Sequence, residues 1–308
     1  MSVRASSPLE APRAQLAALP EAAVVAAGVL DLRRAPDAAS ELGSQLLFGE
    51  PLTVHGLSAD GRFLDVRGPD GYRGFARTLG LATGTGAAVD AWAQRAILRV
   101  RRPWVWRADG GGPLPAHARV APLPDGGVAG PLGPLALRRA DRRALAPFVV
   151  RGAGARRPTA RAWAAAIAPL LGVPYLWGGR TAGGLDCSGF TQLVALALGI
   201  GLPRDARDQC AASGGGAPRR AIPGGPPVRG GGGRRPGRPR VGDLLFFGPT
   251  PDRVTHVALA AGGLAVWHAY GWVRAASLDP AEGAYEGELA ENFLGWNPMP
   301  MPVPDLES

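Results

Sequence analysis

The chain has 308 residues, 46% of them hydrophobic, a size that favours two or three domains over a single core. No uninterrupted apolar run of roughly 18 residues occurs, and the first residues lack the basic and apolar regions of a secretory signal. We therefore expect no membrane span and a cytoplasmic protein. The two cysteines, Cys187 and Cys210, are too few for a disulfide scaffold and fit a reducing compartment.

The formal net charge of +9 raises the question of nucleic-acid binding. All basic residues are arginines, and seven of them lie in the Gly/Pro-rich segment 213–240, outside which the chain is close to neutral. That segment contains no aromatic residue to stack on bases. We therefore predict an incidental, disordered loop at 213–240 and no nucleic-acid partner.

The first half of the chain has the pattern of small β domains. After an N-terminal extension at residues 1–20, short apolar stretches such as PLTVHGLS alternate with Gly, Pro and Asp turns over residues 21–84. The same style returns in ILRVRRPWVWRADGGG and in the stretches after it, over residues 93–150. Short strands at this spacing indicate small barrels or sandwiches. We predict two such domains, the second more degenerate than the first.

Near Arg157 the pattern changes to helices followed by strands. TARAWAAAIAPLLG predicts a helix capped by Thr159 and stopped by Gly172, and SGFTQLVALALG predicts a second helix closed by Gly199. After the arginine-rich segment come strand-like runs, among them DLLFFG, THVALAAGG and LAVWHAYG. Helices followed by an antiparallel sheet predict an α+β domain over residues 156–300.

Cys187 stands where the second of these helices should begin. The N-terminus of a helix offers unpaired N–H groups and a positive dipole end, which lower a cysteine pKa. A nucleophilic thiol also needs a general base, usually histidine, and a group that orients this base. His256 and His268 flank the turn AAGG, so a hairpin would bring them side by side, whereas His55 and His117 lie in the β region and are expected at the surface. Each residue alone is commonly a buried cysteine or a core histidine, but the set favours chemistry.

The motifs YLWGGRTAGGLDCSGF, LPRDARDQ, GDLLFF, THVALA and WHAYG, in this order, resemble the NlpC-type cell-wall cysteine peptidases of the papain-like superfamily. The resemblance implies Cys187 as nucleophile, His256 as general base and His268 as the residue that orients the base. It places Tyr175 near the nucleophile, assisting the oxyanion. It also implies that Asp186 and Ser188 bind the free amine and backbone of the substrate. No metal or cofactor is required in this family's chemistry.

The β region is similar to bacterial SH3-like modules, here two in tandem, on the motifs DLRRAPDAASELGSQLLFGEPLTVHG and DVRGPDGYRGFAR. Tandem modules before such a peptidase resemble the γ-D-glutamyl-L-diamino acid endopeptidases. The resemblance implies that Glu50 and Tyr72 select peptides with an unblocked N-terminal L-Ala. It also implies cleavage between D-Glu and diaminopimelate in recycled wall peptides.

Two other classes of function stay open at this point. One is a catalytically inactive module that binds wall peptide, against which the intact Cys, His and His set argues. The other is a protein that binds nucleic acid or another polyanion through the segment 213–240. Deletion of that segment should abolish the affinity of such a binder but leave the activity of a peptidase. We expect a wall-peptide substrate as the partner, and otherwise a monomer.

Overall fold

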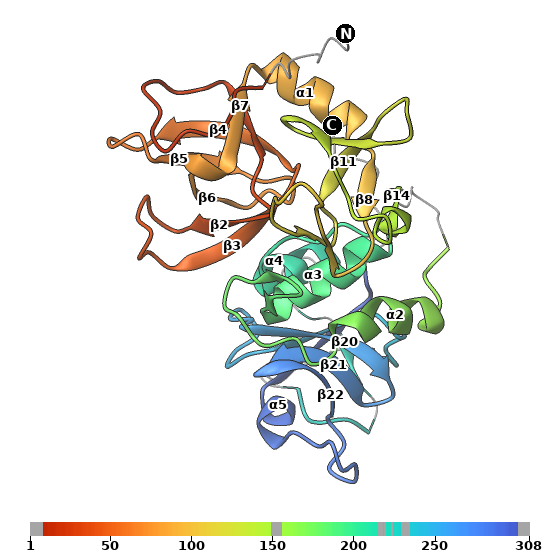
Figure 1. Cartoon of the computed structure of the whole chain (residues 1–308). Coiled ribbons are helices and arrows are strands. Elements are labelled where there is room, and N and C mark those ends of the chain that lie inside the picture. The colour runs from red at the N-terminus through yellow and green to blue at the C-terminus, as the bar shows by residue number, and fades with distance from the viewer. Residues whose placement is uncertain are drawn as a thin grey trace. The chain divides into compact units, whose positions relative to one another are not determined.

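The computed structural model describes residues 9–148, 156–214, 218, 220–222, 224–228 and 235–300. The chain divides into two compact units, unit 1 before residue 150 and unit 2 from residue 150 on. Figure 1 draws unit 1 from red to yellow and unit 2 from green to blue. In the described part of the chain, no helix has the length and apolar character needed to cross a membrane.

Unit 1 begins with an antiparallel sheet of seven strands in the order β3-β2-β6-β5-β4-β1-β7. The strands are β1 (Ala22–Val25), β2 (Val29–Arg33), β3 (Leu42–Leu47), β4 (Pro51–Leu57), β5 (Phe63–Arg67), β6 (Arg73–Arg77) and β7 (Leu81–Gly84). Their inward side chains form an aliphatic core around Leu46, Leu64 and Val66. The sheet occupies the span for which the sequence predicts the first β domain.

A second sheet follows in unit 1, in the order β13-β12-β11-β8-β14, with β9 and β10 paired beside it. The strands are β8 (Leu98–Val100), β9 (Trp104–Val105), β10 (Leu114–Pro115), β11 (Arg119–Pro122), β12 (Val128–Gly130), β13 (Gly133–Leu135) and β14 (Leu145–Pro147). Helix α1 (Gly86–Arg95), which the sequence analysis missed, is capped by Thr85, whose side chain accepts the Ala88 N–H. Its Trp92 joins a core with Val24 of the first sheet and Ala121 of the second. The two sheets therefore share hydrophobic packing within one unit.

Unit 2 is built on a second seven-stranded sheet, in the order β18-β17-β23-β19-β20-β21-β22. Its strands are β17 (Arg220–Ala221), β18 (Arg235–Pro236), β19 (Leu244–Phe247), β20 (His256–Gly262), β21 (Ala265–Tyr270), β22 (Trp272–Ser277) and β23 (Phe293–Asn297). A short hairpin, β15 (Arg180–Thr181) with β16 (Gly184–Leu185), precedes it. The helices are α2 (Ala160–Ile167), α3 (Cys187–Ala197), α4 (Ala206–Gly214) and α5 (Gly287–Glu291).

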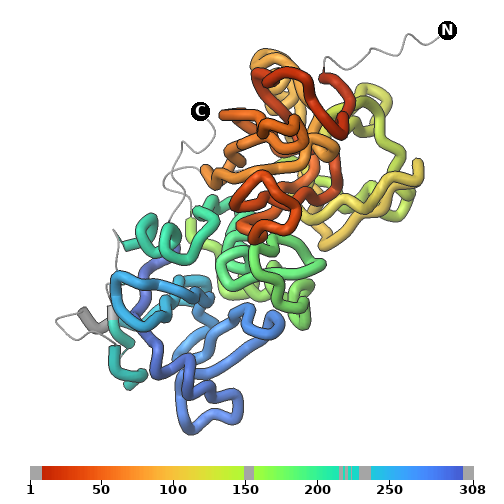
Figure 2. The backbone as a smooth tube through the Cα atoms, turned by 90° about the vertical axis from the view of Figure 1, so that its left-hand side faces the viewer, coloured from red at the N-terminus to blue at the C-terminus, as the bar shows by residue number. Residues whose placement is uncertain are grey.

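The helices of unit 2 cover both faces of this sheet. Helices α3 and α4 lie on one side of the strands in Figure 1, and α5 lies on the other. The α5 side has a core of alternating residues, including Phe247, Ala258 and Val266, packed against Ala290 of α5. Figure 2 shows α3, in green, beside the blue strands of the sheet, although the two are distant in sequence. This packing brings the first turn of α3 close to the start of β20.

Both helices predicted in this region are confirmed. Helix α2 starts after Thr159, whose hydroxyl accepts the Ala162 N–H at 3.2 Å, and continues as a short 3-10 turn, Ala168–Leu170. Gly172 and Gly199 follow α2 and α3 with positive φ angles of 81° and 74°, the left-handed conformation that glycine adopts without strain.

The prediction of a disordered loop over 213–240 is wrong at its two ends. Strand β17 pairs with β23, and β18 pairs with β17 in parallel, so both ends belong to the sheet. Ile222 is buried in the core, and the indole N–H of Trp296 faces the carbonyls of Ala221 and Gly237 at 3.3 and 3.1 Å. Residues 215–217, 219, 223 and 229–234 lie outside the described residues.

Candidate active site

Cys187 is the first residue of α3, as the sequence predicts, and Asp186 is the N-cap. An Asp in this position accepts an N–H of the first helical turn and so satisfies a group that has no partner inside the helix. Here Asp186 Oδ1 accepts the Gly189 N–H at 2.6 Å. The cap fixes where the helix begins, and with it the position of the thiol.

The glycines before and after Cys187 allow a close approach of two backbones. Gly178, in the Trp-Gly-Gly turn, has a φ of 77° and donates its N–H to Asp186 Oδ2 at 2.9 Å. A Cβ on Gly189 would lie 2.1 Å from the carbonyl oxygen of Gly179, a contact that backbone atoms do not tolerate. The turn and the first turn of α3 therefore pack backbone to backbone, with Asp186 between them.

Asp186 also forms a buried ion pair with Arg204. The two guanidinium nitrogens contact Oδ1 and Oδ2 at 3.0 and 2.6 Å, and Arg204 also donates to Ser188 Oγ at 2.9 Å. With the Gly178 and Gly189 amides, the Asp186 carboxylate already has a donor for each of its roughly four lone-pair sites. Arg204 thus holds both Asp186 and Ser188 in position, and their predicted contacts with the substrate stay predictions.

A second set of buried hydrogen bonds holds α3 against α4. Gln209 is fully buried and donates to the carbonyls of Ser188 and Pro203 at 3.0 and 2.9 Å, while Thr191 donates to its Oε1 at 2.7 Å. Cys210, the next residue, is buried and is a free thiol, as is Cys187. The motif LPRDARDQ thus supplies two residues, Arg204 and Gln209, whose hydrogen bonds fix the start of α3.

The environment of the thiol differs from the sequence expectation. The backbone N–H groups of Val257 and Ser188 bond to the Cys187 sulfur and favour the thiolate, as a helix N-terminus should. Burial works against them and is the larger effect, and the adjacent Asp186 charge adds to it. Together they raise the pKa of Cys187 to about 11. The expected lowered pKa is therefore wrong for the free protein, in which the thiol is protonated at neutral pH.

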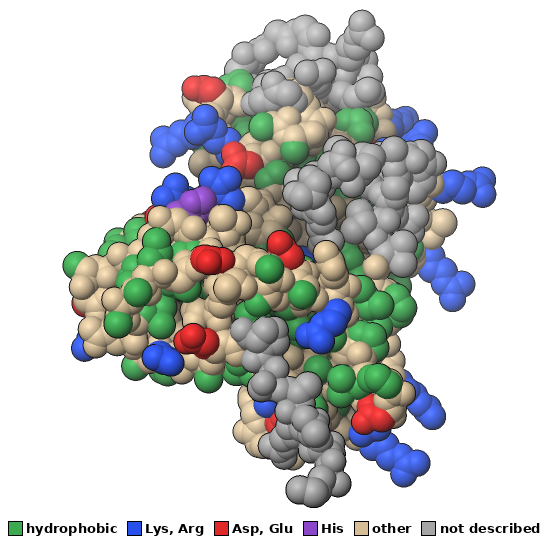
Figure 3. Space-filling view, turned by 90° about the horizontal axis from the view of Figure 1, so that it is seen from above, with side chains coloured by type: hydrophobic (Ala, Val, Ile, Leu, Met, Phe, Trp, Pro, Cys, Tyr) green, Lys and Arg blue, Asp and Glu red, His purple; other side chains and the backbone are tan. Residues whose placement is uncertain are grey.

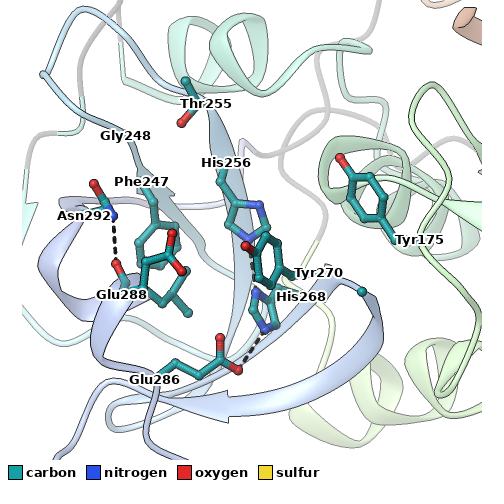
Figure 4. A pocket seen from close by; sticks show the side chains of 12 residues that line it. Tyr175, Phe247, Gly248, Thr255, His256, His268, Tyr270, Glu286, Glu288 and Asn292 are labelled. Atoms are coloured by element: carbon teal, nitrogen blue, oxygen red, sulfur yellow. Dashed lines mark hydrogen bonds and ion pairs between the residues drawn. The ribbon is translucent and has the colours of Figure 1, made fainter.

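His256 and His268 meet through the hairpin that the sequence predicts. Strands β20 and β21 pair so that the two residues lie diagonally on the same face. His256 Nε2 is 3.1 Å from His268 Nδ1, and the ring planes are at 86°. Figure 4 shows the two imidazoles pointing toward each other, with the Tyr270 ring beside them. The Val257 amide bonds to the Cys187 sulfur, so the residue that follows His256 lies at the thiol. His256 Nδ1 is the ring nitrogen that does not face His268.

Both imidazoles are neutral in the resting protein. Burial lowers the pKa of His256 to about 4, and burial together with His256 and Arg274 lowers the pKa of His268 to about 3. At neutral pH His256 and Cys187 are therefore both uncharged, and no preformed thiolate is present.

Tyr175 lies close to the thiol on the segment before the β15–β16 hairpin. Its backbone N–H donates to the Gly271 carbonyl at 2.8 Å, which ties this segment to the turn after β21. Burial, with the nearby Cys187 and Asp186, raises the pKa of Tyr175 above its usual value. The phenol stays protonated at neutral pH and keeps a hydrogen to donate.

A cavity of about 380 Å³ opens beside the histidine pair. The residues that line it include the rings of Tyr175, His256, Tyr270 and Phe247, and the side chain of Leu289. Two carboxylates, Glu286 and Glu288, also line this cavity. The cavity is thus apolar on its sides, with the base at one wall and negative charge at another.

Glu50 and Tyr72 belong to unit 1, at two turns of its first sheet. Thr53 pairs with Arg67, so the turn before β4 and the turn after β5 lie at the same end of the sheet. Glu50 is buried and its Oε2 accepts the Leu47 N–H at 2.9 Å, and Arg34 lies over the Tyr72 ring at 5.4 Å. Their predicted roles in amine selection stay predictions.

Of the remaining histidines, His55 is exposed as expected, whereas His117 is 8% exposed, which corrects the surface assignment. Sequence reasoning also missed Arg204, Gln209 and Glu286. For Arg204 and Gln209 a signal was present, because both stand in a quoted motif without a role. For Glu286 the chain offered no motif, since its partner residues are distant in sequence.

Two family models match the chain. The NlpC/P60 family matches residues 172–286, which include Cys187, His256 and His268. The bacterial dipeptidyl-peptidase SH3 domain matches residues 32–79, which include Glu50 and Tyr72. The chain thus contains an NlpC/P60 domain and a bacterial SH3 domain. The family and the α+β fold with a preceding SH3-like domain, both predicted from the sequence, are confirmed.

Curated relatives match short stretches of the chain. A γ-D-glutamyl-L-lysine dipeptidyl-peptidase of Bacillus subtilis (strain 168) is 38% identical over 100 residues, which are 32% of this chain and 28% of that protein. The enzyme of the same name from Bacillus cereus (strain ATCC 10987 / NRS 248) is 49% identical over 39 residues, 13% of this chain and 12% of that one. The matched stretches thus span under a third of either relative.

Solved structures share the fold over most of the chain. An NlpC/P60 family protein from Bacillus cereus ATCC 10987 superposes with a TM-score of 0.65 at 20% identity, covering 91% of this chain and all of that one. An NlpC/P60 endopeptidase from Photobacterium damselae subsp. piscicida gives a TM-score of 0.62 at 16% identity, covering 91% and 71%. At these identities the likeness establishes the architecture.

Proposed function

We propose that the protein is a cysteine endopeptidase acting on peptidoglycan-derived peptides. The observation that carries this proposal is the placement of Cys187 at the start of α3, next to β20. His256 begins that strand, and its Nε2 is 3.1 Å from Nδ1 of His268 on β21. The NlpC/P60 match over these residues supports the same reading. A buried nucleophile with a neutral base and an orienting residue is the arrangement that acyl transfer needs.

In the first half of the reaction, His256 Nδ1 takes the proton of the Cys187 thiol as the sulfur attacks the substrate carbonyl carbon. The carbonyl oxygen becomes an oxyanion, which we assign to the Cys187 N–H and the Tyr175 hydroxyl. When the tetrahedral intermediate collapses, the C–N bond breaks and His256 gives its proton to the leaving amine. The product is a thioester on Cys187 and a free amine.

In the second half, water replaces the amine. His256 removes a proton from the water as its oxygen attacks the thioester carbon, and the C–S bond breaks. The proton on His256 then returns to the Cys187 sulfur. The free carboxylate leaves, and the thiol and the neutral imidazole of the resting state are restored.

For the substrate we propose the bond between the γ-carboxyl of D-Glu and a diamino acid, in a peptide with a free N-terminal L-Ala. The curated relatives are named for γ-D-glutamyl-L-lysine cleavage, which supports this bond. His256 lines the cavity, so we propose that the cavity receives the diamino acid, whose second ammonium would suit the acidic wall.

We further propose that Glu50 and Tyr72 select the free amino group, which directs the enzyme to turnover or recycling of wall peptides. In intact wall the amino group of L-Ala is in amide linkage. A requirement for a free ammonium would therefore exclude that material. The bacterial dipeptidyl-peptidase SH3 match over both residues supports the proposal.

The test uses purified full-length protein with L-Ala-γ-D-Glu-meso-diaminopimelate and L-Ala-γ-D-Glu-L-Lys, each beside its N-acetylated form. We expect release of L-Ala-D-Glu from the free-amine peptides, and none with the Cys187→Ala variant. Cleavage of acetylated and free peptides at equal rates would contradict the proposed selection for a free amino group, while the proposed peptidase activity would stand. Absence of cleavage of all four peptides by folded protein would overturn the proposed function.

A further inference from the structure

His268 has a second ring nitrogen that the histidine pair does not use. The side chain is fully buried, and its Nδ1 faces His256. Its Nε2 has no hydrogen-bond partner at normal distance, but Glu286 Oε1 lies 3.5 Å from it. Figure 4 shows this carboxylate reaching toward His268 from the side opposite His256. The buried nitrogen therefore points to an acidic group.

Glu286 is held in place from several directions. Arg274, which pairs directly with His268 across β21 and β22, forms an ion pair with the Glu286 carboxylate. The Arg274 guanidinium also contacts the Tyr270 carbonyl at 3.3 Å and lies 5.2 Å from the centre of the Trp272 ring. The Glu286 N–H donates to Ser277 at 3.0 Å. A carboxylate so anchored has a fixed direction, which a freely rotating surface glutamate would not have.

The tautomers of the two histidines are coupled through their contacts. His256 can accept the thiol proton at Nδ1 only if its own hydrogen is on Nε2, which then donates to His268 Nδ1. His268 must in turn carry its hydrogen on Nε2, where it points at Glu286 Oε1. A carboxylate is only an acceptor, so it selects this form. We propose that Glu286 is a positioning residue that sets the tautomer of His268 and, through it, that of His256.

The charged and titratable groups around His268 agree with this assignment. His256 faces it from β20, Tyr270 from β21, Arg274 from β22, and Glu286 from the turn before α5. Since His268 is neutral at physiological pH, its contact with Glu286 is one between an N–H and a carboxylate. When His256 becomes charged during catalysis, the same carboxylate stabilises the charge through the intervening imidazole.

The direct test reads the tautomers in the unsubstituted protein. With only four histidines in the chain, two-bond ¹H–¹⁵N correlation spectra of the full-length protein at neutral pH are assignable by substitution of each. We expect His256 and His268 both to carry hydrogen on Nε2. A His268 spectrum with hydrogen on Nδ1 would overturn the proposal without any variant at Glu286.

The kinetic test compares Glu286→Gln with Glu286→Asp and Glu282→Gln. Glu282 is exposed and four residues away, so its variant removes the same charge from the same segment. We expect Glu286→Gln to lower kcat about 10- to 100-fold, because a wrong tautomer impairs the base, whereas loss of a carboxylate from the cavity wall would appear separately as a higher KM. Glu286→Asp should recover part of kcat, and Glu282→Gln should keep wild-type rates. Equal kcat in wild type and Glu286→Gln would contradict the proposal.

The inference rests on the proposed peptidase function, and a third measurement separates the two. Alkylation of Cys187 by iodoacetamide, followed by peptide mass spectrometry, reports on the base without any peptide substrate. Slower alkylation of Cys187 in Glu286→Gln than in Glu282→Gln supports the positioning role of Glu286, even where the wild type cleaves none of the peptides. If the wild type cleaves the peptides but Glu286→Gln and Glu282→Gln are alkylated at equal rates, the positioning role of Glu286 would be contradicted and the peptidase function would stand.

Discussion

At the residue scale, the central feature is a thiol and an imidazole that are both neutral at rest. The pKa of Cys187 is raised to about 11 and that of His256 lowered to about 4, so neither ionises between these values. The sequence predicts the pair but not this balance, because helix position is local while burial depends on the whole fold. The helix N-terminus contributes in the expected direction and is outweighed by burial and Asp186.

This balance predicts the pH dependence of activity. Below about pH 4, His256 is protonated in the free enzyme and cannot accept the thiol proton, so kcat/KM should fall there. The acid limb should therefore lie well below 6.5, the ordinary pKa of histidine. A pH profile of kcat/KM with the free-amine tripeptide measures it. An acid limb near pH 6.5 would show that His256 is not buried as described.

Arg204 gives a prediction about stability at the same scale. Arg204→Ala leaves the buried Asp186 carboxylate without its cation, and removal of one partner of a buried pair costs about 3–5 kcal/mol. The free energy of unfolding from urea titration should fall by this amount. Arg73→Ala is the matched control, because that arginine pairs with Asp65 at an exposed position and should change stability by under about 1 kcal/mol. Similar losses in both variants would contradict the account.

At the scale of elements, helix α3 is placed by backbone contact with the Trp-Gly-Gly turn. The sequence predicts both helices, because Thr159, Gly172 and Gly199 act within a few residues of the ends they determine. It does not predict that Asp186 caps α3. It does not predict what α3 touches. The contact of Gly189 with Gly179 depends on two segments meeting in space.

Gly189→Ala tests this contact. Its Cβ would lie 2.1 Å from a backbone oxygen, so α3 must shift and carry Cys187 with it. We expect a loss of about 1–3 kcal/mol in the free energy of unfolding and a large drop in kcat. Gly86→Ala, also at the first turn of a helix but with open space around its Cβ, should leave both unchanged. Wild-type activity in Gly189→Ala would show that the turn does not position the nucleophile.

The ends of the segment 213–240 provide a prediction for the sheet. Composition alone favours disorder there, yet Ile222 is buried with Trp296 in the core of unit 2. Ile222→Ala should lower the free energy of unfolding by about 2–5 kcal/mol, as core truncations do. Val228→Ala, at a partly buried neighbour, is the comparison and should cost less. An unchanged urea midpoint for Ile222→Ala would show that Ile222 does not pack in the core, as the prediction of disorder implies.

At the scale of the whole molecule, arginine and acidic side chains both appear on the face drawn in Figure 3. The sequence predicts the two β regions and the α+β domain because strand and helix periodicities are local. The sharing of a core by both sheets of unit 1, through Trp92 of α1, needed the structure.

Unit 1 carries a prediction for specificity in the full chain. Glu50→Gln keeps an oxygen to accept the Leu47 N–H, and Tyr72→Phe keeps the ring beside Arg34, so both should fold normally. We expect the double variant to lose preference for free-amine over N-acetylated peptides, mainly through a higher KM for the former. Unchanged preference, measured as the ratio of kcat/KM values, would assign the selection elsewhere.

The central claim is that Cys187 forms a thioester with the substrate acyl group. Rapid quenching of the wild-type reaction in acid, followed by intact-protein and peptide mass spectrometry, measures this directly. We predict a mass increase equal to the L-Ala-γ-D-Glu acyl group on the peptide that contains Cys187, and none on the peptide that contains Cys210. Hydrolysis without any adduct on Cys187, or hydrolysis that persists in Cys187→Ala, would contradict the account.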